Sequence, residues 1–256
     1  MKRFKEANRV TTANRMAGAG YRMPPLELRW DAMSPLPIGE VRGNSRHSPS
    51  GWEAPPWIES GVPGEPFHFS EHMRQLCGDI AAKYEPLKHI DVSRMIFAFA
   101  QSRNSRSHGL QARVTPLRFH NGDLTRIHHG VNFQVQRFFH EGRDILYVMT
   151  FCLPRFLNRI FDDKFVTIFH EMFHLSAAFD GDLRRHHGRY SVHTASQKRY
   201  DEEMAAMARE YLQSGADPKL HGFLKLNFAQ LRQRHGRVIG HLAPRPKLIP
   251  LRSSLY

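Results

Sequence analysis

Cysteine and long apolar runs are both scarce in this sequence. Only Cys77 and Cys152 occur among 256 residues, and each lies inside an apolar stretch. Two cysteines exclude the disulfide-dense scaffolds of small secreted domains, so we expect two reduced thiols in a protein core. No window approaches the ~18 consecutive apolar residues that a membrane-spanning helix needs. These absences exclude two classes of protein, the disulfide-stabilised secreted domain and the helical membrane protein.

Residues 1–23 are basic and contain no apolar core. A secretory signal needs roughly 7–15 consecutive apolar residues at this place, so none is predicted. With the low cysteine content, this indicates a soluble protein of the cytoplasm that has no membrane partner.

Acidic residues are also few. The chain has 37 Lys and Arg against 24 Asp and Glu, a net charge of +13. Five of the basic residues and no acid fall within 183–200, and eight basic residues against one Asp follow from 214 onward. Such a balance favours contact with nucleic acid or an acidic protein, although it also simply keeps a protein soluble. No RNA-recognition, homeodomain or zinc-finger pattern accompanies the charge.

Proline and glycine divide the chain into two parts. They recur every few residues between 24 and 67, which excludes a long helix there. We therefore predict that residues 1–67 form a basic arm followed by extended chain. Residues 68–256 should form one folded domain, ending in an extended tail where prolines exclude helix.

Strands are predicted first within this domain. The segments 92–100, 110–119 and 144–153 are rich in apolar and β-branched residues, and 131–139 is a weaker candidate in which apolar and polar residues alternate. Polar turns separate them.

Helices surround these strands in the sequence. The first should begin at Ser70 as N-cap and end just before Pro86, and later ones should cover 163–178, 201–213 and 219–234. Strands followed by helices are typical of an α+β domain. We expect a mixed or antiparallel sheet of about four strands, packed on the 163–178 helix and one following helix.

One short pattern carries chemistry. The stretch "DDKFVTIFHEMFHLSAAFDGD" contains His170, Glu171 and His174 in the spacing H-E-x-x-H. In a chain with 17 His, coincidence would produce this pattern about once in 20 such sequences. Apolar residues surround the three, so the helix must be largely buried. Buried imidazole and carboxylate groups need partners, since each unpaired one costs roughly 1–3 kcal/mol.

A zinc ion is the partner that the spacing favours. Residues four apart share a helix face, so His170 and His174 can offer ring nitrogens to one Zn²⁺. Glu171 lies on the adjacent face, where it reaches a water on the metal without ligating the metal itself. Zinc lowers the pKa of that water to about 7, and the glutamate can take its proton. The alternative is a core helix whose histidines bond to backbone or carboxylate groups.

The segment "FHEMFHL" resembles the active helix of the zincin metallopeptidases. The following "FDGDLRRHHGRYSVH" is similar to compact metallopeptidases of phage and bacterial origin, with SprT-like enzymes as a looser analogue. The resemblance implies a zincin-like fold that cleaves protein or peptide, with His170 and His174 as zinc ligands and Glu171 as general base. It also implies an edge strand that holds the substrate, with 144–153 as a candidate neighbouring strand.

A catalytic zinc usually has three protein ligands, and histidines supply the first candidates for the third. His193 is favoured, because SprT-like and related zincins bring a later histidine from a following segment. His186 and His187 lie among arginines, whose charge disfavours a cation.

Acidic residues supply the other candidates. Asp180 falls on the metzincin third-ligand position, but Ala177 replaces the glycine of the expected turn. Glu202 or Glu203 could act as in the gluzincins, at a longer spacing than that group shows. Asp182 and Asp201 could orient a ligating histidine. Each of these acids is also an ordinary turn or first-turn residue.

The motif and the basic charge are compatible with two functions from different classes. The first is a zinc metallopeptidase, and the second is a non-enzymatic nucleic-acid-binding protein with structural zinc or none. Glu171 favours the first, because a structural zinc site has no need of a carboxylate there. A peptidase that acts on DNA-bound proteins would combine the motif with the basic surface.

Overall fold

The computed structural model describes residues 26–30, 36–41, 58–102, 109–185 and 197–251. The predicted basic arm at 1–23 lies outside these ranges. The strands are β1 (Leu26–Arg29), β2 (Ile38–Val41), β3 (Phe67–His68), β4 (Met95–Gln101), β5 (Ala112–Pro116), β6 (Thr125–His128), β7 (Val131–Val135), β8 (Phe139–His140), β9 (Arg143–Asp144), β10 (Tyr147–Leu153), β11 (Val238–His241) and β12 (Leu248–Pro250). The helices are α1 (Phe69–Lys83), α2 (Phe161–Phe173), α3 (Gln197–Gln213), α4 (Pro218–His221) and α5 (Phe228–His235), with 3₁₀ turns η2 (Glu85–Leu87), η3 (Val92–Arg94), η4 (His120–Gly122) and η5 (Gly222–Lys225).

The main sheet is mixed and has seven strands, in the order β1-β2-β11-β4-β10-β5 with β3 paired to β11. Strand β10 runs parallel to β4 and antiparallel to β5, which is the outermost strand at that side. The expected α+β class and mixed sheet are confirmed. The expected count of about four strands is wrong, because β1, β2, β3 and β11 join the sheet from segments too short to show alternation.

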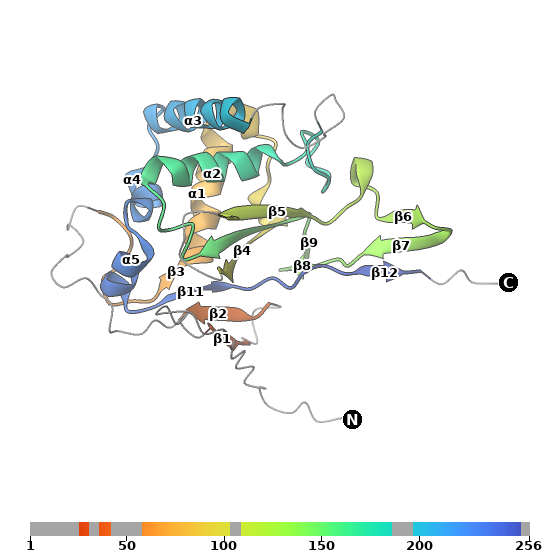
Figure 1. Cartoon of the computed structure of the whole chain (residues 1–256), viewed down its shortest axis with the longest axis horizontal. Coiled ribbons are helices and arrows are strands. Elements are labelled where there is room, and N and C mark those ends of the chain that lie inside the picture. The colour runs from red at the N-terminus through yellow and green to blue at the C-terminus, as the bar shows by residue number, and fades with distance from the viewer. Residues whose placement is uncertain (1–25, 31–35, 42–57, 103–108, 186–196, 252–256) are drawn as a thin grey trace.

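The two faces of the sheet are covered differently. Phe97 of β4 and Met149 of β10 point to the helical side and belong to the larger core. Ile96 and Val148, their neighbours in sequence, point to the opposite side and pack with Val135 of β7. This alternation is the period of two that a strand imposes. Figure 1 shows α2 over the helical face, α3 lying over α2, and the β6, β7 and β12 sheet extending from one end.

The N-cap of helix α1 lies two residues before the predicted one. It is His68, whose side chain accepts a hydrogen bond from the Glu71 backbone N–H. The Ser70 hydroxyl instead accepts from the backbone N–H of His241 at 2.8 Å, which ties the helix to β11. Ser70 was a wrong prediction for the cap because a distant strand uses its hydroxyl.

Helix α2 is shorter than predicted and stops at the motif. It starts after Ile160, with Asp162 and Asp163 in its first turn, and His174 is its C-cap. The helix predicted at 219–234 is broken into α4, η5 and α5. Both cysteines are free thiols, as expected. Within the described ranges, no helix is long and apolar enough to cross a membrane.

A buried lysine joins α2 to the chain that precedes α5. Lys164 is almost fully buried, and its amine donates hydrogen bonds to the backbone oxygens of Leu224 and Leu226, each at 2.8 Å. Burial lowers the pKa of this amine from 10.5 to about 7, because a charged group is disfavoured away from water.

Replacing Lys164 with Met should remove a pH dependence of stability. Between about pH 7 and 10.5 the unfolded chain holds a proton on Lys164 that the folded chain has lost. The contribution of this group to the free energy of unfolding therefore increases as the pH rises through that window. Urea unfolding at about pH 7 and about pH 9.5 should show this gain in the wild type relative to Lys164→Met. The exposed Lys225→Met is the matched control, and an equal pH response in Lys164→Met and the wild type would contradict the assignment.

Candidate active site

The two motif histidines lie together at the C-terminal end of α2. Their ring centroids are 4.5 Å apart and the ring planes are nearly perpendicular, at 88°. The backbone N–H of His174 donates to the carbonyl of His170 at 3.2 Å, so the last helical turn holds both residues. The spacing of four residues therefore places both rings on one face, as predicted.

A tyrosine of α3 packs against both rings. The Tyr200 ring centroid lies 5.0 Å from that of His170 and 6.2 Å from that of His174. Its side chain is almost fully buried, and it fixes the histidine rings between the two helices. Tyr200 was not among the predicted site residues, because the predicted helix began one residue after it. Its spacing to the buried Met204, Ala208 and Tyr211 is the signal that could have included it.

The neighbouring acid on α3 reaches the same site. The Asp201 Oδ1 lies 3.9 Å from His170 Nδ1, an ion-pair distance that is too long for a hydrogen bond. Glu202 and Glu203 are exposed on the next face of the helix. The structure brings Asp201 to the motif, in the position expected of a carboxylate that orients a histidine.

The motif glutamate is buried beneath the sheet edge. Only 7% of Glu171 is exposed. Burial raises the pKa of its carboxyl group to about 7, and a hydrogen bond with the Val114 backbone opposes part of this rise. A proton acceptor works best when its pKa lies near the operating pH. Near neutral pH, the Glu171 carboxyl group therefore exchanges readily between its charged and neutral forms.

Val114 belongs to β5, and no strand of the described chain pairs with the outer edge of β5. Gln111 accepts a hydrogen bond from the Cys152 N–H, and Leu117 donates one to Leu146, so these two residues face β10. Backbone direction alternates along an antiparallel strand, which turns the N–H and C=O of Val114 away from β10, and the N–H donates to Glu171. Pro116 at the same edge has no N–H to offer. The edge strand beside the motif is β5, while the predicted 144–153 strand lies one position further in.

Two other predicted acids serve the turn after the helix. Asp180 accepts a hydrogen bond from the Asp182 N–H at 3.1 Å, which is ordinary turn behaviour. Gly181 between them has φ of +93°, so this turn places its glycine here rather than at 177. The Asp182 carboxylate contacts His120 and Arg185, at 3.2 and 3.0 Å. The structure therefore assigns Asp180 and Asp182 to the turn and its flanks.

Three predicted ligands, His186, His187 and His193, lie outside the described residues. Described residues on either side of that segment contact the motif, namely Arg184 before it and Tyr200 after it. Arg184 donates its backbone N–H to the carbonyl of His174 at 2.7 Å, and its guanidinium lies 4.1 Å from the centre of the Phe173 ring.

The donor chemistry fits zinc in part. Catalytic zinc usually binds three protein donors, and the described chain supplies two imidazoles, His170 and His174, with the Asp201 carboxylate beside one of them. Within the described residues, no three His, Cys, Asp or Glu side chains are close enough together to hold a metal ion. The described chain thus offers two histidine donors and one carboxylate beside them.

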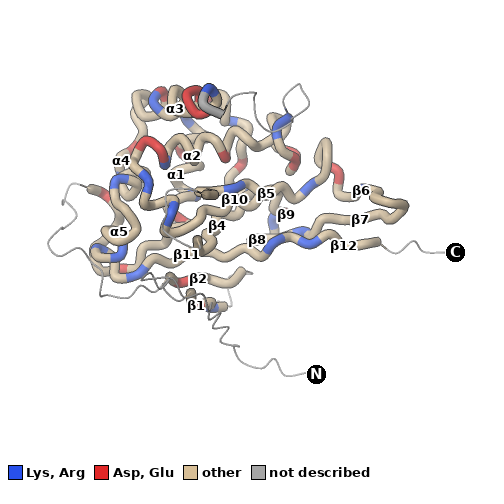
Figure 2. The backbone as a smooth tube through the Cα atoms, viewed as in Figure 1, with Lys and Arg blue, Asp and Glu red and all other residues tan. Residues whose placement is uncertain are grey.

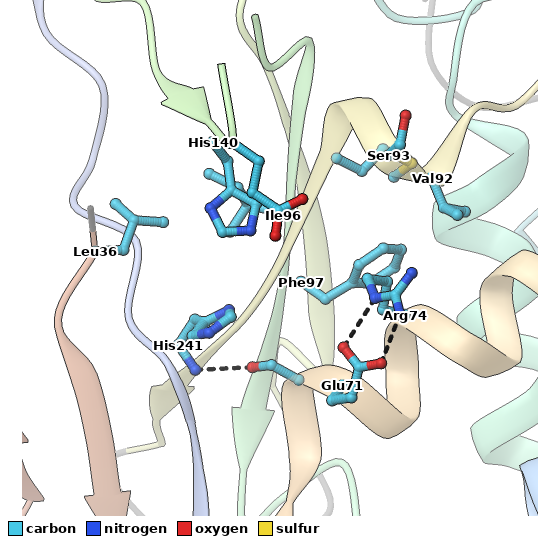
Figure 3. Close-up of a pocket in the computed structure, with 12 residues that line it drawn as sticks. Leu36, Glu71, Arg74, Val92, Ser93, Ile96, Phe97, His140 and His241 are labelled. Atoms are coloured by element: carbon cyan, nitrogen blue, oxygen red, sulfur yellow. Dashed lines mark hydrogen bonds and ion pairs between the residues drawn. The ribbon is translucent and has the colours of Figure 1, made fainter. Parts of the chain in front are cut away.

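A separate pocket of about 250 Å³ lies between α1, β4 and β11. Figure 3 shows Glu71 and Arg74 paired on one side of it and His140 and His241 on another. Burial, with His68 and His140 nearby, lowers the pKa of His241 to about 4, so this ring is neutral at pH 7. No motif residue lines this pocket, and its one arginine is already engaged by a carboxylate.

No protein-family model, no characterised protein and no solved structure matches this chain. The function must therefore be argued from the geometry of the site.

Changing Asp201 to Asn should weaken zinc binding by about 10- to 100-fold, because the carboxylate facing His170 would be lost. Competition with a chelator measures this affinity. Glu202→Gln, one position further along the same helix, is the matched control and should bind zinc like the wild type. Equal losses in the two variants would show that Asp201 has no special relation to the metal.

Proposed function

We propose that this chain is a zinc-dependent metallopeptidase with a zincin-like fold, which hydrolyses peptide bonds. The observation that carries this proposal is one juxtaposition. The buried carboxylate of Glu171 lies between the paired rings of His170 and His174 and the open edge of β5. A core helix with incidental histidines needs neither the base nor the open strand beside it.

His170 and His174 are the proposed ligands on α2, and His193 is the favoured third. Support for His193 comes from the attachment of its segment at both ends, through Arg184 to His174 and through the α3 residue Tyr200 to both rings. Asp201 faces Nδ1 of His170, where it would orient that ring rather than bind the zinc itself. Three histidine donors would leave one position on the zinc open for chemistry.

The chain's own groups divide the reaction between them. A zinc ion held here would lower the pKa of a water molecule to about 7 and polarise the peptide carbonyl. Glu171 accepts the proton of the attacking water and passes it to the leaving nitrogen. The backbone of β5 orients the extended substrate by adding it to the sheet as another strand. Tyr200 and α3 hold the rings and cover the site on the helical side.

Nucleic-acid binding is the second candidate function, and one surface favours it. Lys219, Lys225, Arg234 and Arg237 lie on and around α4 and α5, and we call them the α4–α5 basic surface. Figure 2 shows Lys and Arg gathered there, beside the N-terminal end of α2, whereas the motif lies at the C-terminal end of that helix. Phosphate contacts at this surface would be compatible with a peptidase that acts on DNA-bound proteins, or with a protein that only binds nucleic acid.

Zinc content distinguishes the metal site from incidental histidine binding. The wild type should hold about one zinc per chain, and His174→Ala should lose it, since two donors cannot keep a tightly bound ion. His128→Ala is the control, because His128 is exposed on β6, away from the motif. Equal zinc content in all three proteins would show that His174 does not bind zinc and that the motif has only a structural role.

Hydrolysis distinguishes a catalytic site from a structural one. Glu171→Gln keeps the shape of the side chain and removes the proton acceptor, so cleavage of an unfolded protein substrate should fall by about 10²- to 10⁴-fold. Zinc content should stay unchanged. The exposed Glu203→Gln is the control and should cleave normally. Full activity in Glu171→Gln would overturn the proposed mechanism.

A further inference from the structure

A groove of about 440 Å³ runs along the outer side of β5. One wall is β5 itself, including Thr115, and the other is the chain leading into β12, including Pro246 and Leu248. Three arginines line it, namely Arg113, Arg118 and Arg245. We call it the arginine groove. It adjoins Val114, whose backbone hydrogen-bonds with the buried Glu171.

The charge of the arginine groove is not balanced from within. Arg118 is nearly buried and forms an ion pair with Asp144, so its charge is already engaged. Arg113 and Arg245 are exposed. No acidic side chain is among the residues that line the groove. Two guanidinium groups therefore face a concave space that favours a negatively charged occupant.

The strand period decides how a peptide would use this groove. Ala112 and Val114 point to the helical side of the sheet and pack with the larger core. Arg113 and Thr115 alternate with them and so point to the other side, into the groove. A peptide added to the open edge of β5 alternates in the same way. Every second side chain would face Glu171, and the residues between them would face the arginines.

We propose that the substrate is an acidic segment of protein, bound in extended form, with Asp or Glu at alternate positions that enter the arginine groove. This inference rests on the proposed peptidase function and names its substrate class. The open edge favours a peptide over an oligonucleotide. The C=O of Val114 points to this edge and can accept a hydrogen bond from a peptide N–H, whereas its own N–H donates to Glu171.

Peptide binding to the Glu171→Gln protein tests the inference without requiring cleavage. The probes are two fluorescent ten-residue peptides, one with Asp at alternate positions and one with Asn in place of each Asp. Anisotropy should show the Asp peptide binding about 10-fold more tightly, since two opposite charges meet at the groove. Adding Arg113→Gln and Arg245→Gln should abolish that difference. Arg126→Gln, an exposed arginine of β6 outside the groove, should leave it unchanged.

Several outcomes would overturn the inference. Equal binding of the two peptides would do so, as would an Asp preference that survives loss of both arginines. A single-stranded oligonucleotide that competes as well as the Asp peptide, through the same two arginines, would show a general polyanion site instead. If the Asp peptide shows no binding advantage while the wild type still cleaves neutral peptides, the acidic preference is rejected and the peptidase function is not. Retained Asp preference without any cleavage by the wild type would support the groove and reject the peptidase function.

Discussion

The burial of one carboxylate constrains most of this structure. Glu171 can lie in the apolar layer between the sheet and α3 only because Val114 offers it a backbone partner and the motif rings lie beside it. Burying a carboxyl group in this way costs folding free energy, so its presence here indicates a use for the group. The same burial brings the pKa of Glu171 near 7. The cost to stability and the capacity to move a proton therefore have a single origin.

The parts of the fold predicted from sequence are those whose signal is local. The motif helix, α1 and the strands β4, β5 and β10 show their periodicity within their own residues. Strand β11 has four residues, and its place in the sheet depends on pairing with β2 and β4. The Ser70 hydroxyl was misassigned because its partner, His241, is remote in sequence. Contacts of this kind are set by tertiary packing and leave no trace in a short window.

The candidate site shows the same limit at finer scale. The i, i+4 spacing was enough to place His170 beside His174. Choosing among Asp201, Glu202 and Glu203 required the rotation of α3 about its axis, and each residue along a helix turns by about 100°. A start predicted four residues late left that rotation undefined, and it also hid Tyr200. Asp201 thus faces His170, whereas Glu202 and Glu203, the two predicted as possible ligands, are exposed.

The open edge of β5 has a second consequence, for self-association. An unpaired strand edge can add a strand from any neighbouring molecule, including another copy of the same chain. Pro116 interrupts the row of N–H donors at one end, and Arg113 places a positive charge beside it. In another copy the same edge carries the same charge, so edge-to-edge pairing brings like charges together. The positive charge that favours an acidic peptide at this edge therefore also disfavours aggregation through pairing of two copies.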